Sequence, residues 1–196
     1  MKNYQQIKEK FFEFKHEIFS KHIILETNII EQLNIPKDGY WLEFGVFSGS
    51  TINKLSHLCN KIYGFGSFDG LPEDWVPGHP KGMFKMFELP KVSDNVELVV
   101  GLFEESIPKF LKEHEINKIN FINIDCDLYS STKTVFKYFG PYIKKGTYIY
   151  FDEFLTEKLD KDELHAFAEF LDEYNFDFEI IVSNDYLPLA NLIKII

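Results

Sequence analysis

The sequence contains no arginine: all 21 of its basic residues are lysines, set against 31 aspartates and glutamates. The formal net charge is −10 at pH 7. A protein that binds nucleic acid needs a basic surface, and the arginine fork is the usual bidentate grip on phosphate or carboxylate. We therefore expect no nucleic acid partner. The surplus of carboxylates instead suits a site for a divalent cation, which prefers oxygen ligands.

Cysteines and long apolar runs are also scarce. Cys59 and Cys126 are far apart in the sequence and match neither a disulfide framework nor a zinc site. Cys126 is expected to be a small buried residue, or one pressed against a bound ligand, and not a nucleophile, because nothing near it in the sequence favours a thiolate. No apolar run approaches the roughly 20 residues that cross a bilayer. The N-terminal residues also lack the apolar core and cleavage site of a signal peptide. We expect a cytoplasmic protein that does not contact membranes.

The 196 residues, 45% of them hydrophobic, are enough for one domain with a sizeable core. Near the N-terminus, apolar side chains recur at the spacing of one helix face: Ile7, Phe11, Phe14 and Ile18. A second helix is expected over residues 21–33. We expect residues 1–38 to form an N-terminal helical extension that offers a contact for a homo-oligomer, and residues 39–196 to form the main domain.

Short apolar runs then alternate with helical segments, a pattern that favours a mostly parallel sheet covered on both faces. Seven strands are expected: Tyr40–Phe44, Lys61–Phe65, Val96–Val100, Ile119–Ile124, Thr147–Phe151, Phe176–Val182 and Ala190–Ile195. The helices expected among them are Ser50–Leu58, Ser106–Glu113, Thr132–Tyr142 and a last one carrying Leu164, Phe167, Leu171 and Tyr174. Only a turn around residues 184–188 separates the last two strands. The expected fold is therefore a doubly wound, Rossmann-like α/β domain, with a seven-stranded, mostly parallel sheet whose last strand is antiparallel.

Such sheets bind ligands at the carboxyl ends of their strands. Glu43 lies near the end of the first expected strand, and a turn that contains Gly45 and Gly49 follows it. Ser50 and Thr51 then begin the next expected helix. The spacing E-x-G-x-x-x-G lacks the third glycine of the dinucleotide fingerprint G-x-G-x-x-G. A carboxylate cannot face a pyrophosphate, but it can accept hydrogen bonds from a ligand's ammonium group. This argues against a Rossmann-type oxidoreductase, which stays a rival hypothesis.

The fourth and fifth expected strands each end in two acids, Asp125 and Asp127 after one, and Asp152 and Glu153 after the other. If these strands are neighbours, the four carboxylates meet at one rim, where they repel each other unless a cation lies among them. Hard divalent ions prefer such ligands. The alternative is that individual acids only cap the helices that follow, as aspartate often does.

Four stretches together resemble a known family. They are WLEFGVFSGST from Trp41, GFGSFDGLPEDW from Gly64, IDCDLYSST from Ile124 and YFDEF from Tyr150. They are similar to the motifs of the macrocin O-methyltransferase family (TylF, MycF and NovP type). The resemblance implies a class I methyltransferase fold, S-adenosylmethionine as methyl donor, and a divalent metal such as Mg²⁺ or Mn²⁺. It also implies O-methylation of a hydroxyl on a small sugar-containing acceptor, either a natural-product sugar or a nucleotide-activated precursor of a surface glycan.

The resemblance also assigns residues. The cofactor residues it implies are Glu43, Gly45, Val46, Phe47, Gly49, Ser50, Thr51, Ser67, Phe68, Asp69, Gly101, Phe103, Glu104 and Asp125. The metal ligands it implies are Asp125, Asp152 and Glu153, and the catalytic residues are Asp125 and Asp127, with Asp127 available as a base.

Two positions depart from the family pattern. Gly66 stands where the family has the acid that holds the cofactor's ribose, so either Asp69 takes over that role or the affinity is lower. Glu153 stands where the family often has aspartate. Loss of the ribose acid also motivates the alternative of an inactive relative that binds the cofactor. His79 lies in a loop of roughly 25 residues, a length typical of lids. It is either a base or a solvated loop residue.

Overall fold

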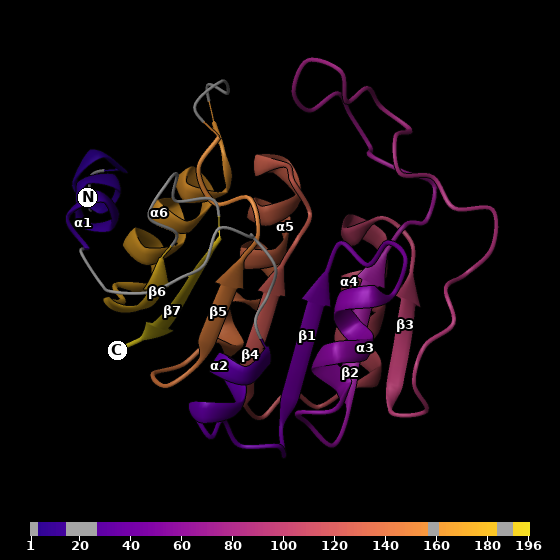
Figure 1. Cartoon of the computed structure of the whole chain (residues 1–196), viewed down its shortest axis with the longest axis horizontal. Coiled ribbons are helices and arrows are strands. Elements are labelled where there is room, and N and C mark those ends of the chain that lie inside the picture. The colour runs from indigo at the N-terminus through magenta and orange to yellow at the C-terminus, as the bar shows by residue number, and fades with distance from the viewer. Residues whose placement is uncertain (1–3, 15–26, 157–160, 184–189) are drawn as a thin grey trace.

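Seven strands form one twisted sheet in the order β3-β2-β1-β4-β5-β7-β6 (Figure 1). The computed structural model describes residues 4–14, 27–156, 161–183 and 190–196. Strands β1 to β5 pair in parallel, whereas β7 is antiparallel to both β5 and β6. The strands are β1 (Tyr40–Phe44), β2 (Ile62–Gly66), β3 (Val96–Val100), β4 (Ile119–Ile124), β5 (Tyr148–Phe151), β6 (Phe178–Ser183) and β7 (Asn191–Ile195).

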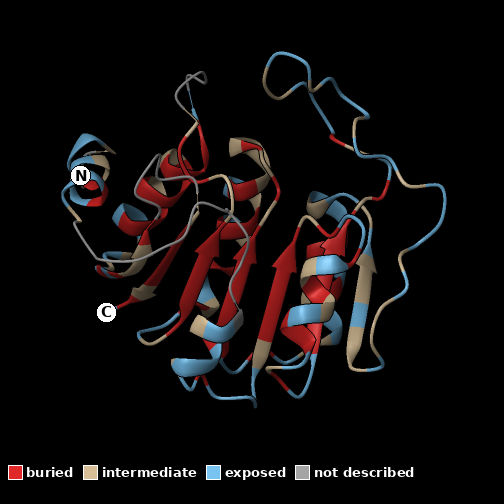
Figure 2. Cartoon of the chain, in the orientation of Figure 1, coloured by how far each residue is buried: buried red, intermediate tan, exposed pale blue. Residues whose placement is uncertain are grey.

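The central strands are buried on both faces of the sheet, which is why their sequences are continuous apolar runs. All residues of β2, β4 and β5 are buried, and the edge strand β3 is partly exposed (Figure 2). The expected neighbourhood of the fourth and fifth strands is confirmed, because Ile124 of β4 pairs with Phe151 of β5. The doubly wound fold predicted from the sequence is therefore observed, with β7 as the antiparallel strand.

Helices cover both faces of the sheet (Figure 1). Side chains of α1, α4, α5 and α6 share one apolar core with the sheet, and side chains of α2 and α3 share a second core on the opposite face. The helices are α1 (Tyr4–Glu13), α2 (Thr27–Gln32), α3 (Ser50–Ser56), α4 (Phe103–Glu113), α5 (Tyr129–Phe139) and α6 (Glu163–Tyr174), and a 3₁₀ turn, η1 (Gly140–Tyr142), follows α5. In the described part of the chain, no helix has the length and apolar character needed to span a membrane.

The N-terminal helix predicted from its apolar spacing is observed as α1. Its Ile7 and Phe11 are buried in the larger core, where the Phe11 ring lies 4.8 Å from that of Phe154 and 5.5 Å from that of Phe178. Three predictions fall outside the described residues: Ile18, the first part of the second expected helix, and the expected turn at 184–188. The later part of that second helix is described and forms α2.

Two helices begin earlier than predicted. Helix α4 was expected to begin at Ser106, which would place Pro108 in the first turn, where proline is tolerated. It begins at Phe103 instead, so Pro108 lies inside the helix. Helix α5 begins at Tyr129 instead of Thr132. The earlier start brings the hydroxyl-rich segment after Asp127 into the first helical turn, directly beside the carboxyl ends of the strands.

Candidate active site

A cavity of about 430 Å³ lies at the carboxyl edge of the sheet. Its walls are the loops after β1, β2, β3 and β4, which is where the sequence predicted a site. This volume lies in the usual range for small-molecule sites. Most of the predicted cofactor residues line it.

The loop after β1 forms one wall through Glu43, Gly45, Val46, Phe47, Gly49, Ser50 and Thr51, all of them predicted cofactor residues. Gly45 has φ +105°, and an added Cβ would lie only 1.6 Å from the carbonyl oxygen of Asp125. The Asp125 N–H in turn donates to the Phe44 carbonyl at 2.9 Å. Glycine is therefore needed at position 45 for backbone to meet backbone between β1 and β4.

Glu43 is only 2% exposed and reaches the cavity from the end of β1. Burial raises the pKa of its carboxyl to about 8, with the Asp152 charge adding to the rise and the Asn123 side chain opposing it. Its Oε2 atom has no hydrogen-bond partner among the described residues. A buried carboxyl with an unpaired oxygen is suited to a ligand's ammonium group, which would pair with it and lower its pKa.

The loop after β2 contributes Ser67 and Phe68 to the cavity, as predicted, but not Asp69. Asp69 points to solvent with 81% of its side chain exposed and forms an ion pair with Lys85 at 3.0 Å. At Gly66, an added Cβ would lie 2.8 Å from the Val46 carbonyl oxygen and 3.3 Å from the Phe68 ring. The aromatic ring of Phe68 therefore lies beside the position where the resembled family carries its ribose acid.

The whole loop, residues 67–95, first extends above the carboxyl edge toward α5 and then runs down beside β3 to the start of that strand (Figure 1). We call it the β2–β3 loop. Its Glu73 and Phe84 also line the cavity, and neither was predicted from the sequence. The His79 ring lies 5.1 Å from the Trp75 ring and 6.0 Å from the Phe84 ring, and its Nδ1 atom is buried without a partner in the described structure. His79 lies close enough to the acidic end of the site to lower the pKa of Asp127, against the larger effects of burial and of Asp152.

Gly101, Phe103 and Glu104 after β3 all line the cavity, as the sequence predicted. Gly101 has φ +134°, and its N–H donates to the Gly66 carbonyl at 3.0 Å, which joins the ends of β2 and β3. Glu104 accepts a hydrogen bond from Thr134 of α5 at 3.1 Å.

The predicted acids are gathered at the ends of β4 and β5, where the Asp152 N–H donates to the Ile124 carbonyl at 3.0 Å. Burial, with Asp152 as the next cause, raises the pKa of Asp127 to about 6 and that of Glu153 to about 7. The pKa of Asp125 is raised well above its ordinary value by burial and by four neighbouring carboxylates, among them Asp152. The acids therefore lie within electrostatic reach of one another, as predicted.

A cation would relieve this repulsion, and the carboxylates are ligands of the right kind for a hard divalent ion. Only Asp125 and Asp127 line the cavity, whereas Asp152 and Glu153 do not. Among residues 4–14, 27–156, 161–183 and 190–196, no three His, Cys, Asp or Glu side chains are grouped closely enough to hold a metal ion. The donor set fits a cation in chemistry, but the described carboxylates are not grouped as a ligand shell.

The backbone at Asp127 is unusual. Its φ is +65°, and the Leu128 N–H donates to the Cys126 carbonyl at 2.7 Å, so Asp127 is the central residue of a three-residue turn. A γ-turn with positive φ is rare and strained, although aspartate tolerates this region better than most residues do. We call residues 125–128 the acidic turn. Strain of this kind persists only where the surrounding structure holds it.

A fifth acid lies beneath the acidic turn and was missed in the sequence. Glu163, the first residue of α6, is fully buried, and burial followed by the Asp127 charge raises its pKa well above the ordinary value. In the sequence it looks like an ordinary acidic residue of a helix's first turn. Only the packing of α6 against α5 places it near the site.

Comparison with known protein families gives one assignment. Residues 80–180 match the family model described as macrocin-O-methyltransferase (TylF). The matched range contains the β3 and β4 ends of the cavity and all four predicted acids after β4 and β5. A comparison with curated protein sequences found no match.

Several solved structures are similar to this chain. CalS11, described as a calicheamicin methyltransferase, is 23% identical with a TM-score of 0.67; its apo structure, which names it a TDP-rhamnose 3'-O-methyltransferase, is 20% identical with a TM-score of 0.55. The O-methyltransferase NovP is 17% identical with a TM-score of 0.58. In each case the alignment covers 86% of this chain and 78% of the other.

An O-methyltransferase from Bacillus cereus in complex with SAH is 13% identical, with a TM-score of 0.56 over 98% of this chain and 88% of that one. At these identities the likeness to solved structures establishes the fold alone. The family assignment therefore depends on the matched sequence range.

Proposed function

The chain belongs to the macrocin O-methyltransferase (TylF) family, and from this premise we propose that it is an S-adenosylmethionine-dependent enzyme that methylates a sugar hydroxyl with the help of a divalent cation. The observation that carries this proposal is that one cavity contains both a carboxyl suited to the donor's ammonium group and a pair of aspartates suited to the acceptor and a cation. Glu43, whose Oε2 atom has no partner among the described residues, lies in the wall formed after β1, and Asp125 and Asp127 lie in the wall formed after β4.

Support for the methyl donor comes from the fit of the cavity. Glu43 would accept hydrogen bonds from the donor's ammonium group, and the backbone of Gly45 and Gly49 would line the donor's methionine end. Gly101, Phe103 and Glu104 would surround its adenine end. When bound, S-adenosylmethionine supplies an electrophilic methyl group on a positively charged sulfur. Transfer of this methyl group to an acceptor hydroxyl would release the hydroxyl proton, which a residue of the site must accept.

Asp127 is the proposed base. With a pKa of about 6 its carboxyl is largely ionised near neutral pH and can accept the proton of the acceptor hydroxyl. Asp125, Asp152 and Glu153 are the proposed ligands of the divalent cation. When bound, the cation would supply positive charge that favours the deprotonated acceptor. Because Asp125 lies in both the cavity wall and the acidic group, it would connect the donor pocket with the cation.

The proposed acceptor is a small sugar-containing molecule, either a natural-product sugar or a nucleotide-activated glycan precursor. The family and the printed description of CalS11 as a TDP-rhamnose methyltransferase support this class. Phe47 and Phe84 line the cavity with ring centroids 5.7 Å apart, and both are partly exposed. Aromatic rings of this kind can pack against the apolar C–H face of a sugar.

The testing experiment incubates the protein with S-adenosylmethionine, Mg²⁺ and a panel of sugar nucleotides and glycosides, and detects methylated products by mass spectrometry. Matched reactions contain EDTA instead of Mg²⁺, or the Asp125→Asn variant. We expect product only in the complete reaction with the unaltered protein. Full methyl transfer in EDTA contradicts the role of the cation. Binding of S-adenosylhomocysteine without transfer to any acceptor favours the alternative of an inactive relative.

Location and assembly remain predictions from the sequence. We propose a cytoplasmic protein, and a homo-oligomer through the N-terminal helices. Ile7 and Phe11 of α1 are buried within the chain's own core, whereas Phe12 is 53% exposed. Any contact between copies would therefore use the Phe12 side of α1, and light scattering of Phe12→Asp against the unaltered protein tests it.

A further inference from the structure

Glu163 lies in a small buried cluster directly behind the acidic turn. Its Oε1 atom accepts a hydrogen bond from the Thr132 hydroxyl at 3.3 Å and lies 4.0 Å from the Cys126 sulfur. The Cys126 sulfur and the Thr132 oxygen are themselves 3.3 Å apart. The three side chains therefore contact one another, with Thr132 fully buried and Cys126 only 7% exposed.

This cluster is the side-chain support of a strained segment. Cys126 lies between Asp125 and Asp127, and its carbonyl accepts the hydrogen bond that closes the turn with positive φ at Asp127. The Cys126 side chain contacts Thr132 of α5 and Glu163 of α6. A change in the position of Cys126 would therefore move both aspartates at once.

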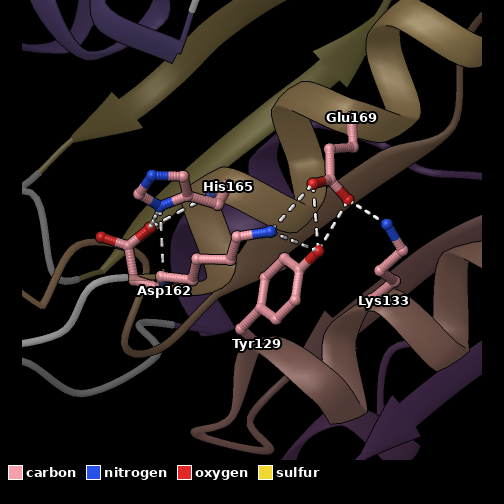
Figure 3. Close-up of polar contacts among 6 residues, drawn as sticks. Tyr129, Lys133, Asp162, His165 and Glu169 are labelled. Carbon is pink, nitrogen blue, oxygen red and sulfur yellow. Dashed lines mark hydrogen bonds and ion pairs between the residues drawn. The ribbon is translucent and has the colours of Figure 1, made fainter.

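The helices that carry Thr132 and Glu163 are fixed to each other on their outer side as well (Figure 3). Glu169 of α6 accepts hydrogen bonds from the Tyr129 hydroxyl at 2.9 and 3.0 Å and another from Lys133, both residues of α5. Lys161 joins the same carboxylate at 3.6 Å.

The first turn of α6 is also capped. The Asp162 side chain accepts from the His165 N–H at 3.1 Å (Figure 3). Glu163 is thus placed on a helix start that is held at its cap and along its length, which makes it a rigid support.

We infer that Glu163 is a positioning residue: through Thr132 and Cys126 it holds the acidic turn in the shape that directs Asp125 and Asp127 into the cavity. Its second oxygen, Oε2, has no partner in the described structure, so the residue costs stability where it stands. A leucine of similar volume would suit this buried position better if packing were all that mattered. The catalytic part of this inference rests on the proposed function, and the structural part does not.

The first experiment measures how often the acidic turn opens. The chain has two cysteines, so in a Cys59→Ala background Cys126 is the only thiol. Its labelling rate by a thiol reagent under native conditions reports local opening. We expect Glu163→Leu and Thr132→Val to raise this rate by roughly tenfold or more, which corresponds to about 1.4 kcal/mol in the free energy of opening. Glu163→Gln keeps the accepting oxygen and should leave the rate within about threefold, or about 0.6 kcal/mol.

Leu164→Ala is the matched control, because Leu164 is the neighbouring buried residue of α6 and its truncation weakens the core without touching the cluster. Global stability is measured for each variant by urea unfolding. If Glu163→Leu labels no faster than the background, or only as fast as Leu164→Ala at equal loss of stability, the inference is wrong. This outcome does not depend on any enzymatic activity.

The second experiment measures turnover with an acceptor identified by the panel above. We expect Glu163→Leu to lower kcat by roughly tenfold to a hundredfold, the cost of small misplacements of reacting groups. The dissociation constant of S-adenosylhomocysteine should change by less than about threefold, and Glu163→Gln should restore kcat. An unchanged kcat in Glu163→Leu overturns the catalytic part. Accelerated labelling in a protein that methylates no acceptor would leave the positioning role in place and reject the proposed function.

Discussion

The Oε1 atom of Glu73 accepts a 2.6 Å hydrogen bond from the hydroxyl of Ser130, so the β2–β3 loop is joined to the first turn of α5. Both residues line the cavity. The bond closes the loop over the site three residues beyond Asp127. It therefore connects the segment that covers the cavity with the segment that carries its acids.

We predict that Glu73→Ala and Ser130→Ala each weaken binding of S-adenosylhomocysteine by roughly fivefold, which corresponds to about 1 kcal/mol for one hydrogen bond. The double variant should lose little more than either single one, because all three lack the same bond. Isothermal titration measures this. Lys85→Ala is the control, since it breaks the exposed contact with Asp69 in the same loop. Losses that simply add would disprove the coupling.

A second prediction concerns two glycines with similar backbone angles and different surroundings. Gly45 (φ +105°) would place a Cβ 1.6 Å from the Asp125 oxygen, whereas Gly78 (φ +94°) has no atom within 4 Å of such a Cβ. Gly78→Ala should cost only the strain of the left-handed region, about 1 kcal/mol. Gly45→Ala should cost about 3 kcal/mol or more and abolish binding of S-adenosylhomocysteine. Urea unfolding checks both, and equal costs would mean that the loop after β1 relaxes freely.

The third prediction revises an expectation from the sequence. Gly66 stands in place of a ribose acid, so restoring aspartate there could be expected to tighten cofactor binding. The structure leaves no room for it, because the new Cβ would lie 2.8 Å from the Val46 carbonyl. We therefore predict that Gly66→Asp weakens the binding of S-adenosylhomocysteine, and that Asp69→Ala, which changes a side chain outside the cavity, leaves it unchanged. Tighter binding by Gly66→Asp would refute the close approach of the Val46 carbonyl to Gly66.

The fourth prediction follows from the raised pKa of Glu43, about 8 in the folded protein against an ordinary value of 4.5. Between these values the folded state binds more protons than the unfolded chain. The stabilising contribution of Glu43 is therefore complete below about pH 4.5 and is lost as the pH rises through about 8. In the absence of ligands, the free energy of unfolding should fall across this window, with Glu43 contributing at most about 1.4 kcal/mol per pH unit.

Glu43→Gln should reduce that slope without abolishing it, because Asp127 and Glu153 also have raised pKa values. Urea unfolding at a series of pH values measures the slope. A slope that is the same in Glu43→Gln and in the unaltered protein would show that Glu43 is already ionised in the folded state.

The fold was largely predictable because strands of a buried parallel sheet consist of continuous apolar runs, which can be recognised in the sequence. The bounds of β1, β3 and β4 agree with the prediction, and those of β2, β5, β6 and β7 differ by one or two residues. Larger errors fall at the starts of α4 and α5, where Pro108 and the hydroxyls after Asp127 concealed an extra turn. The cavity residues that follow β1 were predictable because they lie close together in the sequence, within one short motif.

Other parts of the site depend on contacts that no local pattern records. Glu163 is 37 residues from Cys126 in the chain, and Glu73 is 57 residues from Ser130. Each looks like a solvated acid in its own segment. The strained φ of Asp127 was equally hidden, because aspartate is common in ordinary turns.

The direct meeting of backbone at Gly45 and Asp125 has a thermodynamic consequence for the proposed enzyme. No side chain separates the loop beside the donor from the turn beside the cation, so a ligand that orders one should order the other. Binding of the donor and binding of the cation would then be cooperative, and reciprocity requires each to raise the affinity of the other by the same factor. In a cell, the supply of one would set how tightly the protein holds the other.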